Sequence, residues 1–425
     1  MTTARCLLGG LTLCLVLAGC STDERTEGSP PETPTGSPTS PTAEATPEEQ
    51  TSEQPSEPRR RQPVLFVTHA TLPRLALTRP QARHVLRGEL SSRRVVAAPG
   101  MPVGPDVPVL RSATAVRRQV ERDPGTVGVL PARSAVPTVR AAVVAGVDPL
   151  RDPRSYPLLT RGPRPARPTT LTVVGDLMLT RGVPDAARAL RPLSDRLRSA
   201  DVTVGNLEST LSRDGTPHQG GDSFGADLAA ASRAAVVARH GTTFGLLGFN
   251  AIGETPEAAA RQSGALSISM PPRTGPLDVA ELRRVQRLVR DLARRVDVVV
   301  VVPHWGEQYT HAPWAVQRLV ARRLVDAGAD LVAGGHPHWV QGLDAYRGAV
   351  AAHSLGNYVF DMDFATETQQ GVLLETTFWG DRLVGVDLVP YRMGPGFAPA
   401  PAVPEEAADI LADVWSTSTG PFRAR

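Results

Sequence analysis

The stretch DVVVVVPHWGEQY, residues 297–309, decides the fold. Its unbroken run of valines is typical of a strand buried on both faces, as in a parallel sheet covered by helices. The run ends abruptly at Pro303, and His304 follows at once. In α/β sheets, sites form outside the carboxyl ends of the strands, where loops converge on one crevice. The sequence therefore places His304 where a site is expected.

Three further segments share this layout of an apolar strand that ends in polar residues. LTVVG leads into Asp176, DVTVG leads into Asn206 and Glu208, and DLVAGG leads into His336 and His338. Two carboxylates and three histidines at one edge form an N/O donor set for a divalent metal, with Mn, Fe or Zn the best matches. Such a centre supports metal-assisted hydrolysis, in which bound water loses a proton near neutral pH and attacks phosphorus.

Each of these residues also has an ordinary explanation. Asp176 can cap the turn that follows it, and Asn206 and Glu208 can bond the backbone at a strand end. A lone His304 after a buried strand is more often structural than a ligand. His336 and His338, however, flank a proline after a double glycine, where imidazole rings add little to the packing of a core. The placement of all five ligand-type residues at strand ends therefore favours a site.

Upstream, short strands alternate with helices, which predicts a compact α/β domain over residues 62–160. PVLFVTHA is predicted to be a strand, and LTRPQARHVLRGEL a helix with Thr78 as its N-cap. The proline-rich RGPRPARP at residues 161–168 is typical of a linker. A second α/β domain is expected over residues 169–395, followed by a C-terminal tail over residues 396–425.

Within the first nineteen residues, an apolar run follows Arg5 and is too short to span a bilayer. The run ends in LAGC, so residues 1–19 are predicted to be a lipoprotein signal peptide with Cys20 as the lipidation site. An ordinary signal peptide with an incidental cysteine is the alternative. Residues 20–61 are rich in Pro, Thr, Ser and Glu and are expected to be a disordered spacer. The expected location is the extracytoplasmic face of the cell membrane, through a lipid anchor.

Composition excludes several functions. Cys6 and Cys14 lie in the predicted signal, so the mature chain would keep Cys20 alone and could form no internal disulfide. All 46 Lys+Arg residues are arginine, the formal net charge is only +3, and the arginines are scattered. Nothing in the sequence resembles the basic stripe with interleaved aromatics that nucleic acid requires.

The second domain contains the motifs GDLML, GNLEST, HWGEQY, AGADLVAGGHPHWVQGLDAYRG and HSLGNYVFD. They resemble those of the CapA family of poly-γ-glutamate capsule synthesis proteins, relatives of the calcineurin-like metallophosphoesterases. The resemblance implies an α/β/β/α sandwich with a metal centre at the strand ends. By motif, Asp176 and Glu208 take the places of the metal-binding carboxylates, and His304, His336 and His338 those of the histidines.

The N-terminal domain contains LRGEL, GTVGVLPA and the segments VDPL and YPLL. With these it resembles one lobe of a phosphate-type solute-binding protein.

One departure from the family pattern is important. An Asn-Asn-His element between NLE and HWG, which supplies a bridging asparagine and a histidine near the leaving group, is not found in the sequence. The chain therefore lacks roughly one βα unit of a typical member, and Glu307 receives no role. His353 and Asn357 are expected to orient ligands from behind, although Asn357 can equally serve a tight turn. Arg181 could contact an anionic group or be an exposed charge.

Two functions follow from these features. The first is a surface lipoprotein in capsule, poly-γ-glutamate or related envelope-polymer synthesis, with a degenerate metal-dependent phosphoesterase-type site that acts on a phosphate-containing substrate. The second is a non-catalytic lipoprotein that binds or organises an anionic surface polymer. Capsule synthesis machinery is the expected partner. A third interpretation, an importer's substrate-binding protein, draws on residues 63–160 alone.

Overall fold

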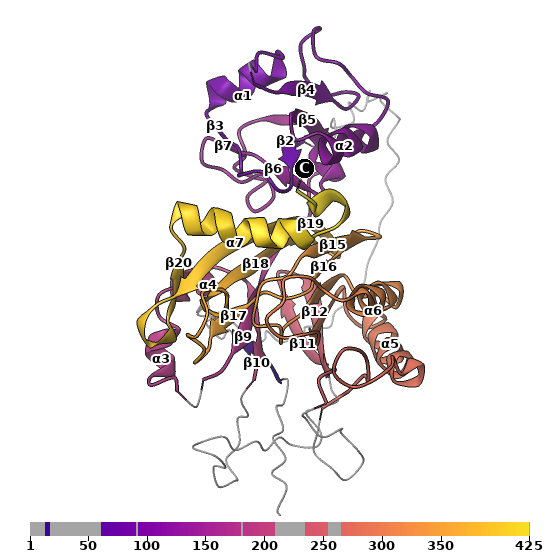
Figure 1. Ribbon diagram of the computed structural model, residues 1–425. Coiled ribbons are helices and arrows are strands. Elements are labelled where there is room, and N and C mark those ends of the chain that lie inside the picture. The colour runs from indigo at the N-terminus through magenta and orange to yellow at the C-terminus, as the bar shows by residue number, and fades with distance from the viewer. Residues whose placement is uncertain are drawn as a thin grey trace, which may run out of the picture.

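The computed structural model describes residues 13–17, 61–90, 92–179, 182–208, 234–253 and 265–424, with residues 13–17 described by backbone alone. They form a small N-terminal α/β domain and a larger domain of two packed sheets with helices outside (Figure 1). The predicted α/β class is therefore confirmed. Apart from Arg61, the predicted spacer lies outside the described residues.

The N-terminal domain is a mixed sheet of strand order β4-β5-β2-β6, with β8 paired to β2 and a separate β3–β7 pair. Thr78 is the N-cap of the first helix, as predicted, and forms a capping box with Gln81. The elements are β2 (Arg61–His69), β3 (Ala76–Leu77), α1 (Arg79–Leu86), β4 (Arg94–Ala97), α2 (Ala113–Arg122), β5 (Thr126–Pro131), η1 (Ala132–Ser134), β6 (Val139–Ala141), β7 (Val143–Val144) and β8 (Leu159–Arg161).

The larger domain contains a six-stranded sheet of order β11-β12-β13-β14-β16-β15. Strands β12, β13, β14 and β16 run parallel. The valines of β13 alternate: Val300 packs into the core between the two sheets, and Val301 packs under the outer helices. The valine run is thus apolar on both faces because both faces are covered. The elements are β11 (Ala235–Arg239), β12 (Thr242–Asn250), α5 (Val279–Ala293), β13 (Val298–His304), α6 (Ala315–Asp326), β14 (Leu331–Ala333), β15 (Leu343–Tyr346) and β16 (Ala349–Ala352).

The second sheet has the order β1-β10-β9-β18-β19-β20, with β17 also paired to β9. Leu171 and Val173 of β9 face the core between the sheets, whereas Val174 and Leu177 face outward against Ala189. Strand β1, within the predicted signal peptide, pairs antiparallel with β10. The elements are β1 (Leu13–Leu17), β9 (Pro168–Leu177), α3 (Ala186–Ala189), α4 (Ser194–Arg198), β10 (Val202–Leu207), β17 (Asn357–Val359), η2 (Glu367–Gln369), β18 (Gln370–Trp379) and β19 (Arg382–Met393).

The segment expected as a C-terminal tail, residues 396–425, is folded against the larger domain over its described part. It forms η3 (Pro395–Phe397), β20 (Pro399–Pro401), α7 (Pro404–Thr417) and η4 (Gly420–Phe422). Ile410, Val414 and Phe422 are buried in the core between the two sheets. Burying such side chains stabilises a fold by about 1.5–3 kcal/mol each, which explains why the segment is ordered.

The two domains meet at the end of the two packed sheets where β9 begins. Trp379 pairs with Pro168 at the start of β9, and its Nε1 donates a hydrogen bond of 2.8 Å to the carbonyl of Leu150. Glu375 is 4% exposed and is bonded by Arg151 of the N-terminal domain. In Figure 1 the N-terminal domain lies beyond α7, and the opposite ends of β9 and β10 point away from it. The N-terminal domain therefore sits far from the strand ends that carry the candidate site.

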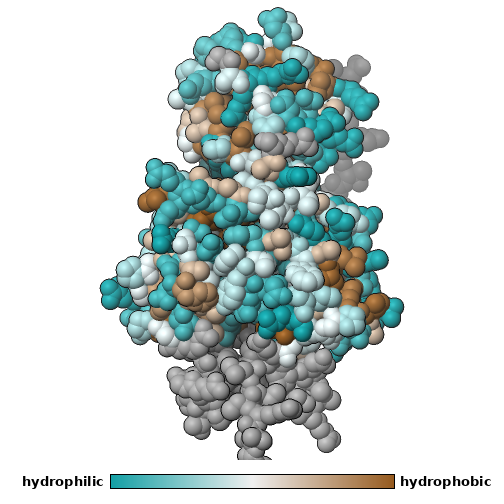
Figure 2. Space-filling view, in the orientation of Figure 1, coloured by the Kyte–Doolittle hydropathy of each residue, from teal (hydrophilic) through white to brown (hydrophobic). Residues whose placement is uncertain are grey.

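No helix among the described residues is long and apolar enough to cross a bilayer. On the face seen in Figure 2, hydrophobic residues are scattered in small groups among hydrophilic ones. Scattered exposed apolar residues are ordinary on a protein surface.

Replacing Trp379 with alanine should weaken the domain junction. The variant loses a buried indole and the bond to Leu150, so we expect the free energy of unfolding to fall by about 3–5 kcal/mol. Urea unfolding followed by circular dichroism measures this change. Trp314→Ala is the matched control, because Trp314 is 45% exposed and its loss should cost about 0.5 kcal/mol or less. Equal unfolding midpoints for the two variants would contradict the junction described here.

Candidate metal centre

Asp176 lies at the centre of the candidate site. It stands at the end of β9, opposite Asn206 of β10 on one side and Asn357 of β17 on the other. The carboxylate is fully buried, and Oδ1 accepts a bond of 2.7 Å from Asn206 Nδ2. Oδ2 accepts one of 2.8 Å from the backbone N–H of His336. Among the described residues, the bonds of Asp176 reach across to other strand ends.

His304 lies at the end of β13, next to Asn250 at the end of β12. Its Nδ1 is 2.9 Å from Asn206 Nδ2, so the Asn206 amide joins His304 to Asp176. Burial lowers the pKa of His304 to about 4, against the opposing effect of the Asp176 charge. A neutral imidazole at neutral pH is the form that binds metals.

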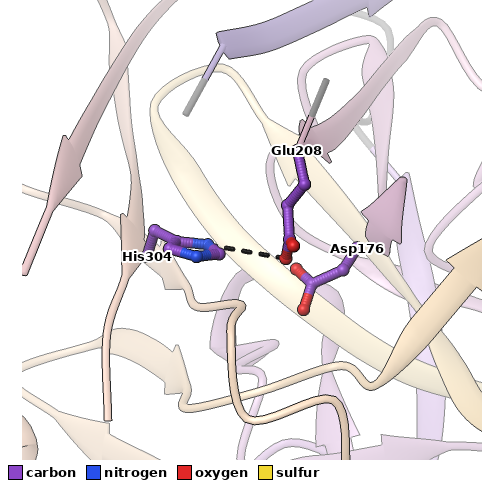
Figure 3. A group of neighbouring side chains, drawn as sticks. All are labelled: Asp176, Glu208 and His304. Carbon is purple, nitrogen blue, oxygen red and sulfur yellow. Dashed lines mark ion pairs between the residues drawn. The ribbon is translucent and has the colours of Figure 1, made fainter. Parts of the chain in front are cut away.

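Asp176, Glu208 and His304 form a group whose ligand atoms all lie within 4.8 Å of one another. Their side chains point toward one another from the ends of three strands, and His304 Nδ1 lies 3.7 Å from Glu208 Oε1 (Figure 3). Carboxylate oxygen and imidazole nitrogen suit Mn, Fe and Zn. The strand-end pattern of the sequence thus predicted three residues that the fold brings together.

The two histidines of GGHPH complete one wall of the site. The ring centroids of His304 and His336 are 4.8 Å apart, and those of His336 and His338 are 5.8 Å apart. His338 Nδ1 lies 3.7 Å from Asp176 Oδ2. His336 and His338 have φ angles of 95° and 59°, a conformation that costs energy and is retained where the surroundings enforce it.

The glycines of this motif permit the close approach. A Cβ on Gly335 would lie 2.1 Å from Asp176 Oδ1, and a Cβ on Gly334 would lie 2.3 Å from the carbonyl oxygen of His353. Neither contact is tolerable, since the first neighbour is a buried, bonded carboxylate and the second is backbone. The double glycine is therefore required for the segment to pass across Asp176.

Unsatisfied polar atoms test whether the site suits a metal. Within the described part of the chain, Asn206 Oδ1 and His336 Nε2 are buried and have no hydrogen-bond partner. Burial also lowers the pKa of His336 well below its ordinary value. Buried polar atoms without partners cost about 1–3 kcal/mol each. An amide oxygen and a neutral imidazole nitrogen are both metal-ligand types, so the residues fit a divalent cation.

Other predicted residues have different surroundings. Asn357 Oδ1 lies 2.9 Å from His338 Nδ1, where it can orient that ring. His353 does not join the group, because its Nε2 pairs with Asp344 and its ring stacks on Trp305. Glu307 is not among the clustered ligands. Arg181 lies outside the described residues, as do residues 209–233 and 254–264 of the stretch between NLE and HWG.

Two residues near the site were not singled out from the sequence. The ring of Tyr309 stacks on His338 at 5.9 Å, and Phe360 contacts the same imidazole edge-to-face at 4.9 Å. Asn250 ends β12 beside His304, and its Nδ2 is buried without a partner among the described residues. The available signal was that Tyr309 and Phe360 stand inside the motifs HWGEQY and HSLGNYVFD.

Comparison with known proteins gives a family match over part of the second domain. Residues 221–362 match the family model described as bacterial capsule synthesis protein PGA_cap. This range contains His304, His336, His338 and Asn357, whereas Asp176 and Glu208 precede it.

Similar curated proteins point the same way. The chain is 34% identical to the capsule biosynthesis protein CapA of Bacillus anthracis over 33% of this chain and 32% of that protein. It is 40% identical to the PGA biosynthesis protein CapA of Bacillus subtilis (strain 168) over 21% of this chain and 23% of that protein. A "probable polyglutamine synthesis accessory protein" of Mycobacterium tuberculosis is 29% identical over 40% of this chain and 46% of that protein. The chain thus spans less than half the length of these relatives.

Two solved structures are also similar in part. An ABC-type phosphate transport receptor from Vibrio cholerae covers 22% of this chain and 50% of its own, with 18% identity and a TM-score of 0.20. A hypothetical protein from Thermus thermophilus covers 53% of this chain and 99% of its own, with 15% identity and a TM-score of 0.35. TM-scores this low do not establish a shared fold.

The buried histidines make the stability of the protein depend on pH. The pKa of His304 is about 4 in the folded state, below its ordinary value of 6.5, so the unfolded chain binds more protons between these values. The stabilisation is complete above pH 6.5 and is lost as the pH falls toward 4, by about 1.4 kcal/mol per unit of depression.

Urea unfolding of metal-free protein between about pH 4 and 7.5 measures this loss. His304→Gln is the control, and its unfolding free energy should change less steeply over the same range. A wild-type unfolding free energy that stays constant from pH 6.5 to 4 would contradict a buried neutral imidazole.

Proposed function

From the CapA-family domain that this chain carries, we propose that the protein acts in the synthesis of a capsule, poly-γ-glutamate or a related cell-envelope polymer. We propose further that its second domain is a calcineurin-like α/β/β/α sandwich with a metal-dependent phosphoesterase-type site. The observation that carries the proposal is the convergence of Asp176, Glu208 and His304 at the ends of three strands. A phosphate-containing substrate is the class that such a centre takes.

The ligands are held by a defined set of hydrogen bonds. Asn206 bonds Asp176 and lies against His304, so it fixes the distance between two of the three ligands. Supporting bonds of this kind tune metal affinity, commonly by about 10- to 100-fold. A bound Mn, Fe or Zn ion would act here as a Lewis acid and lower the pKa of coordinated water.

The tautomer of His338 follows from its neighbours. Asn357 Nδ2 donates to the carbonyl of Thr368 at 2.9 Å, which leaves Asn357 Oδ1 facing His338 Nδ1. Nδ1 therefore carries the proton, and Nε2 keeps its lone pair. In its neutral form, His338 thus donates its one ring proton to Asn357. Its Nε2 can accept a hydrogen bond or bind a metal ion.

A non-catalytic role is the second candidate. The observation that favours it is the absence from the sequence of the Asn-Asn-His element, which in the family supplies one metal ligand and a histidine near the leaving group. In this case the domain binds or organises an anionic surface polymer without cleaving it. The chain's partners in either role would be the capsule synthesis machinery.

Metal content and hydrolysis distinguish the two candidates. The purified full chain should bind about one divalent ion per chain and hydrolyse bis-p-nitrophenyl phosphate. His304→Ala should reduce bound metal and turnover at least about tenfold, since one of three ligands is lost. Elemental analysis and release of p-nitrophenol measure the two effects.

The matched control is His240→Ala. His240 is a partly exposed histidine outside the candidate site, and among the described residues it forms an ion pair with Asp201. The control should keep wild-type metal content and turnover. Bound metal without turnover would support the non-catalytic candidate. A folded wild-type chain with neither metal nor turnover would contradict the metal centre itself.

We also propose that the protein is anchored by lipid on the extracytoplasmic face of the membrane. The support is the sequence LAGC, which places Cys20 at the end of the apolar run. Cys20→Ser should abolish incorporation of radiolabelled palmitate and shift the protein from the membrane fraction to the soluble one. Cys14→Ser is the control and should remain labelled. Equal labelling of both variants would exclude Cys20 as the lipidation site.

A further inference from the structure

The side-chain amide of Asn250 is a buried hydrogen-bond donor that has no acceptor among the described residues. Asn250 is 1% exposed, and its Nδ2 is one of the buried side-chain atoms that lack a partner there. Asn206 Oδ1 and His336 Nε2 share this condition, but these two atoms are of types that bind metal ions. An amide N–H is only a donor, so a cation would leave it unsatisfied. The site therefore needs an acceptor atom as well as a metal ion.

The orientation of the Asn250 amide is fixed. Its Oδ1 accepts a hydrogen bond of 2.9 Å from the backbone N–H of Ile252. Exchanging Oδ1 and Nδ2 would set two N–H groups against each other, so the nitrogen is the end without a partner. The backbone is equally fixed, because the Asn250 N–H donates to the carbonyl of Leu266 at 2.8 Å and its carbonyl accepts from Ile268 at 2.9 Å. The donor is thus held in one place.

Asn250 and His304 end neighbouring parallel strands and face the same side of the sheet. They are register partners in the β12–β13 pair, and the N–H of Ala251 donates to the carbonyl of His304 at 2.8 Å. Leu246 and Val302 precede them at even spacing, and both face the core between the two sheets. Side chains alternate along a strand, so Asn250 and His304 continue this inner row at the strand ends. Adjacent strands lie about 4.8 Å apart, which places the amide beside the His304 ring.

The charges near this amide favour an anion. In Figure 3 the ring of His304 points toward the carboxylates of Asp176 and Glu208, which a bound divalent ion would balance. Burial lowers the pKa of His304 and His336, and the charge of Arg273 lowers both further, so a positive charge acts at the site. An oxygen that carries negative charge is the strongest acceptor that an N–H donor can meet in these surroundings.

We propose that Asn250 Nδ2 donates a hydrogen bond to a phosphoryl oxygen of the substrate at the metal centre. This inference rests on the proposed function, because that function supplies the phosphate. Asn250 is then a substrate-binding residue and not a metal ligand. Hydrogen bonds to charged oxygen are stronger than those between neutral groups, and a donor fixed in advance stabilises charge that develops on the phosphoryl oxygens during attack by water.

Inorganic phosphate tests the donor directly. Asn250→Ala removes the amide, whereas Asn250→Asp keeps an oxygen for the Ile252 N–H and replaces the donor with a charged acceptor. In the full chain loaded with Mn²⁺, we expect Asn250→Ala to bind phosphate roughly 10- to 100-fold more weakly than wild type, and Asn250→Asp more weakly still. Isothermal titration calorimetry measures these affinities, and elemental analysis checks that metal content is equal. Equal phosphate affinity in all three proteins would overturn the proposal.

Two further variants serve as controls. A serine hydroxyl can accept from the Ile252 N–H and still donate, so Asn250→Ser should recover part of the phosphate affinity that Asn250→Ala loses. Gln286→Glu makes the matching change of amide to carboxylate on α5, where Gln286 Nε2 donates to the carbonyl of Arg323. This variant should bind phosphate as wild type does, and circular dichroism checks the folding of every variant.

A structural water is the competing partner for Nδ2. Asn250, Ser267 and Thr274 are among the residues that line a cavity of about 100 Å³, which is large enough for water. In that case Asn250→Ala would lower the midpoint of urea unfolding and leave phosphate affinity unchanged, and the proposal would be overturned.

Failure of the proposed function gives a different result. If phosphate binds to the wild-type chain equally well with and without EDTA, the metal centre is contradicted. The comparison of wild type with Asn250→Ala in EDTA then still decides on the donor: weaker binding by the variant supports it, and equal binding overturns it.

Discussion

The buried carboxylate of Asp176 is the constraint on which the site depends. It lies at the junction of β9, β10 and β17, and it is bonded both by a side chain and by the backbone of the GGHPH segment. A buried carboxylate requires such partners, because an unpaired one would destabilise the fold. Gly335 is the residue that lets the second partner approach. The two sheets are therefore joined at the site through Asp176 and Asn206, and the three histidines lie around this carboxylate.

Much of this arrangement could be predicted from the sequence because it follows from strand geometry. Parallel strands put their carboxyl ends at one edge, so Asp176, Glu208 and His304 could be grouped from their positions after the apolar runs. The valines of β13 and the cap at Thr78 are similarly local signals. These features depend on the period of a strand or on one turn of a helix.

Features that depend on long-range packing could not be predicted in this way. The C-terminal helix has local signals at its start, with Pro404 followed by Glu405 and Glu406, but these do not reveal that Val414 is buried between the sheets. His353 is close in sequence to the histidine pair, but the fold pairs it with Asp344. Tyr309 reaches His338 only because its loop lies across the Pro337 carbonyl. In each case the deciding contact joins residues whose relation is set by topology and not by spacing.

Charge explains why the candidate site suits a metal ion. Burial lowers the pKa of His304 and His336, and the charge of Arg273 lowers both further. Both imidazoles are therefore neutral at neutral pH and keep a lone pair that can bind a metal. They add no positive charge beside the carboxylates of Asp176 and Glu208. A bound divalent cation would balance these carboxylates and would leave a centre that attracts phosphate.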